Sequence, residues 1–119
     1  MQNSPQDLHK KILGKKGEKL VADYLKKQGY KILAKNYKTP FGEADLIVSD
    51  GDELAFVEVK TRTDVKYGTP AEAVGKDKQR RYRQIAQAYG LKTGQEPNAR
   101  FDVAEVYADG KIEYIKHAF

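Results

Sequence analysis

Apolar residues near the start of the chain recur with the spacing of an amphipathic α-helix. The recurring positions are Leu8, Ile12, Leu13, Leu20, Val21, Tyr24 and Leu25. Ser4 suits the capping position, Pro5 suits the first turn, and Gly29 is the residue type that commonly follows a helix. Gly14 and Gly17 fall inside this segment, where they either interrupt the helix or allow another segment to pack closely against it. The pattern therefore predicts a helix between Ser4 and Gly29.

The middle of the chain has the alternation of β-strands. Three such segments follow one another: Tyr30–Tyr37, Glu43–Ser49 and Glu53–Arg62. Pro40-Phe41-Gly42 marks the first turn, and Asp50-Gly51 is a strong signal for a tight hairpin between the second and third strands. If Asp50-Gly51 forms a two-residue turn, Ser49 pairs with Asp52. We then expect Asp45 opposite Phe56 and Glu43 opposite Glu58.

A second helix and two further strands complete the predicted order αβββαββ. The helix is expected at Lys76–Leu91, after a loop at Tyr67–Pro70, and its apolar side is formed by Tyr82, Ile85, Ala86 and Tyr89. A polar linker, Thr93–Arg100, leads to strands at Phe101–Tyr107 and Lys111–Ile115. The sequence thus predicts one α/β domain over residues 1–119, with a central mixed sheet flanked by helices and a short C-terminal strand.

Composition excludes several kinds of chemistry. The chain has 119 residues, the length of a single domain, and it contains no cysteine. Thiol catalysis, thiolate-bound zinc and disulfides are therefore excluded. The longest apolar run is Leu54–Val57, with four residues, so we expect neither a transmembrane helix nor a signal peptide. The expected location is the cytoplasm.

The net charge of +5 is unevenly distributed. Residues 1–31 contain eight lysines and three acids, and the segment Lys76–Arg83 contains five basic residues and one acid. Acidic residues gather instead between Glu43 and Glu58. Two basic segments around an acidic centre suit a polyanion backbone that approaches a cation-binding site, although a solvated lysine-rich surface explains the same charges.

Three carboxylates are expected on one face of the predicted hairpin. Because alternate residues of a strand share a face, Glu43 and Asp45 lie on the same side as Glu58 and Lys60. Carboxylates this close repel each other unless a cation relieves them. Two carboxylates, Asp45 and Glu58, together with the backbone carbonyl of Val59 and water, form an oxygen ligand set that Mg²⁺ or Mn²⁺ prefers. Lys60 would orient the attacking water or stabilise developing negative charge.

The spacing of Glu58 and Lys60 is not distinctive by itself. Random placement predicts about three acid-x-base pairs in such a chain, and the sequence contains three. Only Glu58-Val59-Lys60 lies inside an apolar strand, where charge is costly, and only this pair has a second acid, Asp45, directed at it from a neighbouring strand. A structural charge network remains the alternative explanation.

Several segments together resemble a known family. They are Gly17-Glu18, Gly29–Leu33, Gly42–Ile47, Phe56–Arg62, Glu72-Ala73-Val74 and Phe101-Asp102-Val103. In this order they resemble the YraN-like bacterial family, which is placed in the restriction-endonuclease-like PD-(D/E)XK nuclease superfamily near the archaeal Holliday junction resolvases. The resemblance covers about residues 12–107.

This resemblance implies a restriction-endonuclease-like αβββαβ core with its metal site on the second and third strands. Asp45, Glu58 and Lys60 stand at the positions of the superfamily's catalytic aspartate, glutamate and lysine. Glu18 matches an acid that some relatives place on the first helix near the metal, although a helix-surface acid would look the same. Ala44 departs from the superfamily pattern, which has proline there.

Other charged residues have candidate binding roles. Lys76, Arg80 and Arg83 lie opposite the apolar side of the second helix and are candidate phosphate contacts; a solvated face is the alternative. Lys78, a further candidate for nucleic-acid binding, falls on the apolar side with Gln79 beside it, so both could point at the active site. Gln79 and Glu43 are candidate supporting residues around the metal ligands, and Glu43 could equally face solvent.

We therefore expect a nuclease that uses Mg²⁺ or Mn²⁺ to hydrolyse phosphodiesters in branched or structured DNA. A nucleic-acid-binding protein of the same fold without turnover is one alternative, and a protein-interaction module is the other. Symmetric cleavage of two strands would suit a homodimer, but no self-complementary patch is evident in the sequence.

Overall fold

The computed structural model describes residues 5–62, 74–94 and 98–119, with side chains described from residue 15 onward. The elements follow the predicted order αβββαββ. Ser4 and the predicted loop at Tyr67–Pro70 lie outside the described residues. No helix in the described ranges is both long enough and apolar enough to cross a membrane.

Helix α1, Pro5–Lys27, is continuous through its glycines. Its buried side chains Val21, Ala22 and Leu25 pack against the sheet. Gly17 allows α1 to approach the sheet closely, because a Cβ there would lie only 2.7 Å from the Thr61 methyl carbon. The helix ends before Gly29, whose φ of +93° is a backbone conformation that favours glycine.

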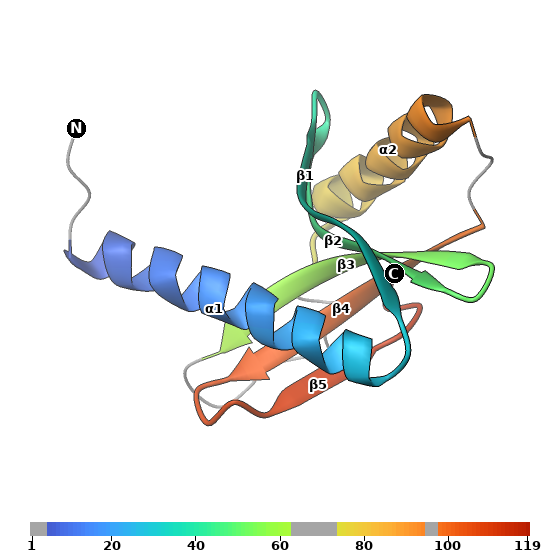
Figure 1. The fold of residues 1–119 in the computed structure, drawn as a ribbon. Helices are drawn as coiled ribbons and strands as arrows, with labels where there is room; N and C mark the ends of the chain where they lie inside the picture. Colours follow the sequence, from blue (N-terminus) through green and yellow to red (C-terminus); the bar gives the residue numbers. More distant parts are fainter. Residues whose placement is uncertain (1–4, 63–73, 95–97) are drawn as a thin grey trace.

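In the described residues, five strands form one mixed sheet (Figure 1). They are β1 Lys31–Thr39, β2 Gly42–Asp50, β3 Glu53–Arg62, β4 Ala99–Tyr107 and β5 Ile112–Ile115. Their spatial order is the order of the chain, and β3 and β4 are parallel while the other neighbours are antiparallel. Helix α2, Lys76–Thr93, lies in the connection between the two parallel strands. The predicted α/β fold with a short C-terminal strand is thus confirmed.

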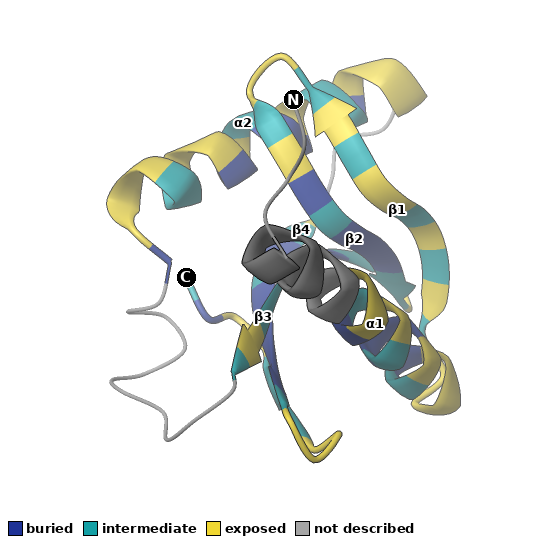
Figure 2. Cartoon of the chain, turned by 90° about the vertical axis from the view of Figure 1, so that its left-hand side faces the viewer, coloured by how far each residue is buried: buried dark blue, intermediate teal, exposed yellow. Residues whose placement is uncertain are grey.

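The two helices cover opposite faces of the sheet. On β3, Ala55 and Val57 pack with α1, whereas Phe56 packs with Tyr82, Ile85 and other residues of α2. Because both faces are covered, β3 contains an unbroken run of buried residues, from Ala55 to Glu58 (Figure 2). Tyr82 is 1% exposed and lies in the core, as predicted. Asp45 and Glu58 therefore lie near the boundary between sheet and α2.

The pairing of β2 with β3 differs from the prediction. Asp50 pairs with Glu53, so the turn consists of Gly51 and Asp52, and the predicted pairing of Ser49 with Asp52 is wrong by two residues. Gly51 takes the first turn position with φ of +64°, where glycine is favoured. The expected positions of Asp45 opposite Phe56 and of Glu43 opposite Glu58 are therefore also wrong.

The predicted alternation along β2 also fails at one point. Ala44 packs with Ile47 on the α2 side, although strict alternation placed Ala44 with Leu46 and Val48. The pairing with β3 runs only from Asp50 to Leu46, which pairs with Val57. Beyond that pair β2 no longer follows its neighbour, and Asp45 is the first residue past the end of the pairing.

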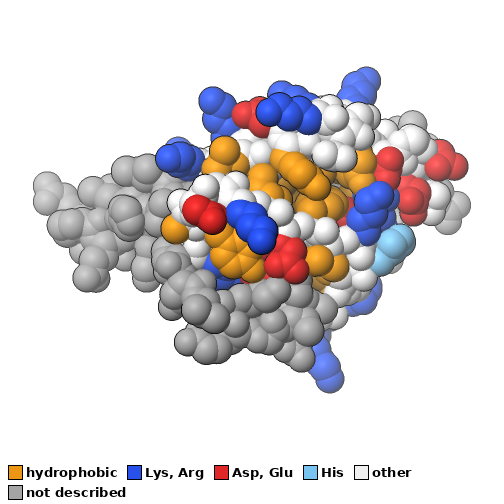
Figure 3. All heavy atoms as spheres, turned by 90° about the horizontal axis from the view of Figure 1, so that it is seen from below, with side chains coloured by type: hydrophobic (Ala, Val, Ile, Leu, Met, Phe, Trp, Pro, Cys, Tyr) orange, Lys and Arg blue, Asp and Glu red, His pale blue; other side chains and the backbone are white. Residues whose placement is uncertain are grey.

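A buried arginine fastens the hairpin to β4. Arg100 is 2% exposed and forms ion pairs with Asp50 at 2.7 Å, Glu53 at 3.1 Å and Asp102 at 3.1 Å. Asp102 also accepts a hydrogen bond from Tyr114 of β5. This network supplies the polar groups of that end of the sheet with partners. Figure 3, a view of the molecule from below Figure 1, shows apolar side chains with charged side chains around them.

Candidate active site

Asp45 is fixed by the strand next to it. Its Oδ2 atom accepts a hydrogen bond from the backbone N–H of Val59 at 2.8 Å. This bond occurs where the pairing between β2 and β3 has ended, so a side chain takes the place of a backbone acceptor. Because Val59 follows Glu58 directly, the bond places the carboxyl group of Asp45 beside that of Glu58.

Glu58 is a buried carboxylate with three partners. It is 2% exposed. The hydroxyl group of Tyr82 donates to Oε1 at 2.7 Å, and the ammonium group of Lys60 lies 3.2 Å from Oε2. Lys78 donates to the same Oε2 atom. Glu58 and Lys60 lie close together, as predicted, and two side chains of α2, Lys78 and Tyr82, also contact Glu58.

The electrostatics of the two acids differ sharply. Burial, reinforced by the negative charge of Glu58, raises the pKa of Asp45 to about 7, although the bond from Val59 opposes the rise. Burial alone would also raise the pKa of Glu58, but the hydrogen bonds from Lys78 and Tyr82 outweigh it and hold that pKa below its ordinary value. One acid is thus held ionised and the other close to its titration point at neutral pH.

Glu18 of α1 and Glu43 of β2 lie around this pair. Burial raises the pKa of Glu18 above its ordinary value, a hydrogen bond with Asn36 opposes the rise, and the charges of Glu43 and Glu58 add to it. Glu18 in turn contributes to the raised pKa of Asp45. Glu43 is exposed, which agrees with a solvent-facing acid. A ligand role for Glu18 stays a prediction.

The donor atoms present suit a hydrated divalent cation rather than a closed metal cage. Among the described residues, no group of three or more histidine or acidic side chains is arranged to hold a metal ion. The carboxylates of Asp45 and Glu58 nevertheless lie close enough for the charge of one to raise the pKa of the other. Mg²⁺ is commonly held by one or two carboxylates, with waters and substrate oxygens completing its shell. The residues fit that kind of ion.

The four candidate nucleic-acid contacts of α2 divide into two groups. Lys76, Arg80 and Arg83 are exposed, as predicted for phosphate contacts or a solvated face. Arg80 pairs with Asp77 at 3.2 Å, and the guanidinium of Arg83 lies 5.9 Å from the centre of the Phe101 ring. Lys78 differs from them because it turns inward to Glu58.

Two residues near the site have different surroundings from those expected. The side-chain amide of Gln79 donates to the backbone carbonyl of Val74 at 2.9 Å, so its described partner is not one of the two acids. Tyr82 was expected only as a core residue, yet its hydroxyl binds Glu58. The signal in the sequence that could have indicated this contact is the spacing of four residues between Lys78 and Tyr82, because residues four apart share one side of a helix.

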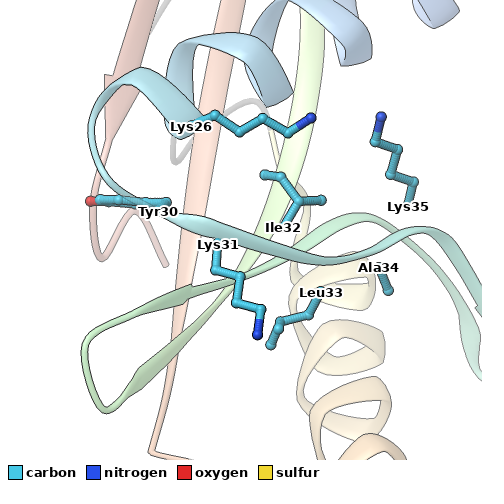
Figure 4. A pocket seen from close by; sticks show the side chains of 7 residues that line it. All are labelled: Lys26, Tyr30, Lys31, Ile32, Leu33, Ala34 and Lys35. Carbon is cyan, nitrogen blue, oxygen red and sulfur yellow. The ribbon is translucent and has the colours of Figure 1, made fainter.

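A separate groove lies at the edge strand β1. It has a volume of about 640 Å³, and its lining includes Lys26 of α1 together with Lys31 and Lys35 of β1. Figure 4 shows Lys26 and Lys35 on one side of the strand and Lys31 on the other. None of the described residues that line it carries a carboxylate, so these residues offer no anionic ligand for a metal ion.

Comparison with known sequences assigns the chain to a protein family. Residues 17–106 match the model of the uncharacterised protein family UPF0102. The chain belongs to this family. The YraN-like resemblance of the sequence motifs is thereby confirmed, and the matched UPF0102 segment contains every residue of the candidate site.

Relatives from three bacteria support the assignment. The chain is 47% identical over 107 residues to a UPF0102 protein of Thermodesulfovibrio yellowstonii, which covers 90% of this chain and 95% of the relative. It is 44% identical over 119 residues to one from Caldanaerobacter subterraneus, covering 94% and 98%. A UPF0102 protein of Syntrophus aciditrophicus is 50% identical over 110 residues, covering 89% and 87%.

Proposed function

We propose that this UPF0102 protein is a divalent-metal-dependent nuclease of the PD-(D/E)XK type. Its substrate would be structured or branched DNA, and we expect it to act in the cytoplasm. The observation that carries the proposal is the buried Glu58 carboxylate, beside Asp45 and 3.2 Å from the ammonium of Lys60. A buried charge cluster costs stability that an apolar strand would not cost, so a role in chemistry accounts for its presence.

Each residue has a defined role in this proposal. Asp45 and Glu58 would hold Mg²⁺ or Mn²⁺, with a contribution from the carbonyl of Val59 and, as predicted from the sequence, from Glu18. When bound, the cation would supply an activated water and would neutralise charge on the phosphoryl oxygens. Lys60 would orient that water or stabilise the developing negative charge. Tyr82 holds the Glu58 carboxylate in place through Oε1.

The partners of Glu58 also favour a second candidate. Both of its oxygens already bind groups of the protein, since Tyr82 donates to Oε1 while Lys60 and Lys78 lie at Oε2. A carboxylate satisfied in this way needs no metal. The alternative is therefore a nucleic-acid-binding protein that keeps the fold without turnover, with Lys76, Arg80 and Arg83 as candidate contacts.

A cleavage assay with labelled substrates tests the proposal. Four-way junction, flap, linear and single-stranded DNA, and RNA, would be incubated with the wild-type protein in Mg²⁺, Mn²⁺ or chelator. We expect cleavage of structured DNA that requires the cation and is lost in Glu58→Gln and Lys60→Ala. Asp77→Asn is the matched control, because Asp77 is an exposed acid of α2 whose side chain is 77% exposed.

Thermal unfolding gives a readout that does not depend on turnover. A cation bound to the folded state stabilises it by about 1.4 kcal/mol at ten times its dissociation constant. We expect Mn²⁺ to raise the melting temperature of wild type and Asp77→Asn but not of Glu58→Gln. Cation-independent melting together with DNA binding and no cleavage would overturn the nuclease proposal in favour of the binding protein.

A further inference from the structure

Apart from Asp45 and Glu58, the same part of the sheet contains an ion pair between Arg62 and Glu105 whose hydrogen-bonding groups are only partly used. Glu105 of β4 is fully buried at 0% exposure, and its Oε2 atom accepts a hydrogen bond from Nε of Arg62 at 2.7 Å. Its other oxygen, Oε1, is buried and has no hydrogen-bond partner within the described part of the chain. Glu105 is the register partner of Lys60 across the parallel strands. The pair therefore adjoins the candidate active site.

The geometry leaves the outer part of the arginine available. A guanidinium has five N–H donors, and a carboxylate commonly binds two of them in a fork. Here the bond from Arg62 to Glu105 uses Nε, and among the described residues the terminal nitrogens of Arg62 form no hydrogen bond. The Arg62 side chain is 28% exposed, so part of it has access to solvent.

Such a pair is difficult to explain by stability alone. A buried carboxylate costs several kcal/mol of desolvation, and a single bond to a partly exposed arginine, with one oxygen left unpaired, offsets little of that cost. What the pair does provide is a fixed orientation of the guanidinium. Arg62 also lies two residues beyond Lys60, and alternate residues of a strand share a face. An anion bound near Lys60 would therefore meet both side chains.

We propose that Arg62, held in place by the buried Glu105, binds a backbone phosphate of the nucleic acid next to the phosphodiester at the Asp45–Glu58 pair. This proposal rests on the nuclease function proposed above and assigns a substrate contact within it. A planar guanidinium recognises phosphate with two parallel hydrogen bonds. Glu105 acts as a positioning residue, since it touches the arginine and not the substrate.

The test measures equilibrium DNA binding in chelator, so that turnover is not required. Arg62→Gln with Glu105→Gln removes both charges, leaves the net charge unchanged and leaves no buried ion without its partner. Asp52→Asn with Lys38→Gln is the matched control, since it makes the same two kinds of change at exposed positions outside both basic segments. Fluorescence anisotropy of a labelled four-way junction over a range of salt concentrations gives the affinity and its salt dependence, and circular dichroism checks the fold.

We expect the Arg62/Glu105 variant to bind about tenfold more weakly, the range for losing a hydrogen bond to a charged group. The slope of log affinity against log salt should also fall by about 0.7–0.9, which corresponds to one phosphate contact. The control should match wild type. An Arg62/Glu105 variant with the affinity and slope of the control would overturn the proposal.

The Glu105→Leu variant distinguishes a positioning role of Glu105 from an effect of its charge on DNA binding. Removal of a negative charge near DNA strengthens binding if Glu105 acts only through electrostatics, whereas loss of an oriented Arg62 weakens it. Tighter binding would overturn the positioning role. Wild type that binds and depends on Arg62 but never cleaves would refute the nuclease function alone, and wild type that cleaves without dependence on Arg62 would refute this inference alone. Absence of any nucleic-acid binding would refute both.

Discussion

Lys78 of α2 and Lys60 of β3 share one oxygen of Glu58. Lys78 donates a hydrogen bond to Oε2, and the ammonium of Lys60 lies 3.2 Å from the same atom. The sequence placed Lys78 on the inner side of its helix, but only the packing of α2 on the sheet brings it to this carboxylate. A protein cation thus lies on an atom that a divalent metal would also use.

The shared oxygen predicts competition between Lys78 and the metal. In Lys78→Met, we expect Mn²⁺ to bind roughly fivefold more tightly, because about 1 kcal/mol of charge repulsion is removed. Isothermal titration calorimetry in metal-free buffer measures the dissociation constant. Lys76→Met, which removes an exposed lysine from the same helix, should leave it unchanged. Weaker binding in Lys78→Met would mean that the lysine holds Glu58 in its ligand position instead of competing for it.

The raised pKa of Asp45 predicts the pH dependence of stability. That pKa is about 7 in the folded protein against an ordinary value of 3.8. Between these values the folded state binds a proton that the unfolded chain releases, so this residue lowers the stability as pH rises. Asp45→Asn lacks this titration. We therefore expect its melting temperature, relative to wild type, to increase from pH 4 to pH 8.

Thermal unfolding in chelator at several pH values measures the difference between the two proteins. Glu58 titrates in the opposite sense, because its pKa is lowered and its stabilisation is lost as the pH falls below its ordinary range. Comparison of wild type with Asp45→Asn at each pH largely cancels that contribution. A difference in melting temperature that stays constant from pH 4 to pH 8 would show that Asp45 is not protonated near neutrality.

Local patterns predicted the elements and the faces of β3 because both follow from short-range geometry. Alternation placed Glu58 with Lys60, and the helical period placed Tyr82 inside. The hairpin register was not predictable in the same way, since it depends on which turn position Gly51 takes. An Asp-Gly pair is compatible with more than one position, and a change of turn moves every partner along the strand.

Contacts between segments that lie far apart along the chain could not be predicted from the sequence. Arg62 and Glu105 are 43 residues apart, and their meeting depends on the parallel register of β3 and β4. No turn motif sets that register, because the two strands are joined by a crossover containing α2. The hydroxyl of Tyr82 meets Glu58 for the same reason. Its helix position was predictable, but the placement of α2 over the sheet depends on side-chain packing.

The close approach of Gly17 to Thr61 predicts how a substitution at the contact between α1 and β3 changes the stability of the protein. An alanine Cβ at position 17 would lie 2.7 Å from the Thr61 methyl carbon, which is closer than real contacts allow. Alanine favours a helix over glycine by about 0.5–1 kcal/mol, but overpacking costs about 1–3 kcal/mol. We expect Gly17→Ala to lower the free energy of unfolding by about 1 kcal/mol, measured by urea denaturation.

A second substitution at the same contact should restore the stability that Gly17→Ala loses. Thr61→Ser removes the methyl group and should change the stability little by itself, because Thr61 is exposed. In the double variant Gly17→Ala with Thr61→Ser, the clash is absent and the helical preference of alanine remains, so the stability should return to at least that of the serine variant. A Gly17→Ala protein that is more stable than wild type would show that α1 lies farther from β3 than the 2.7 Å approach requires.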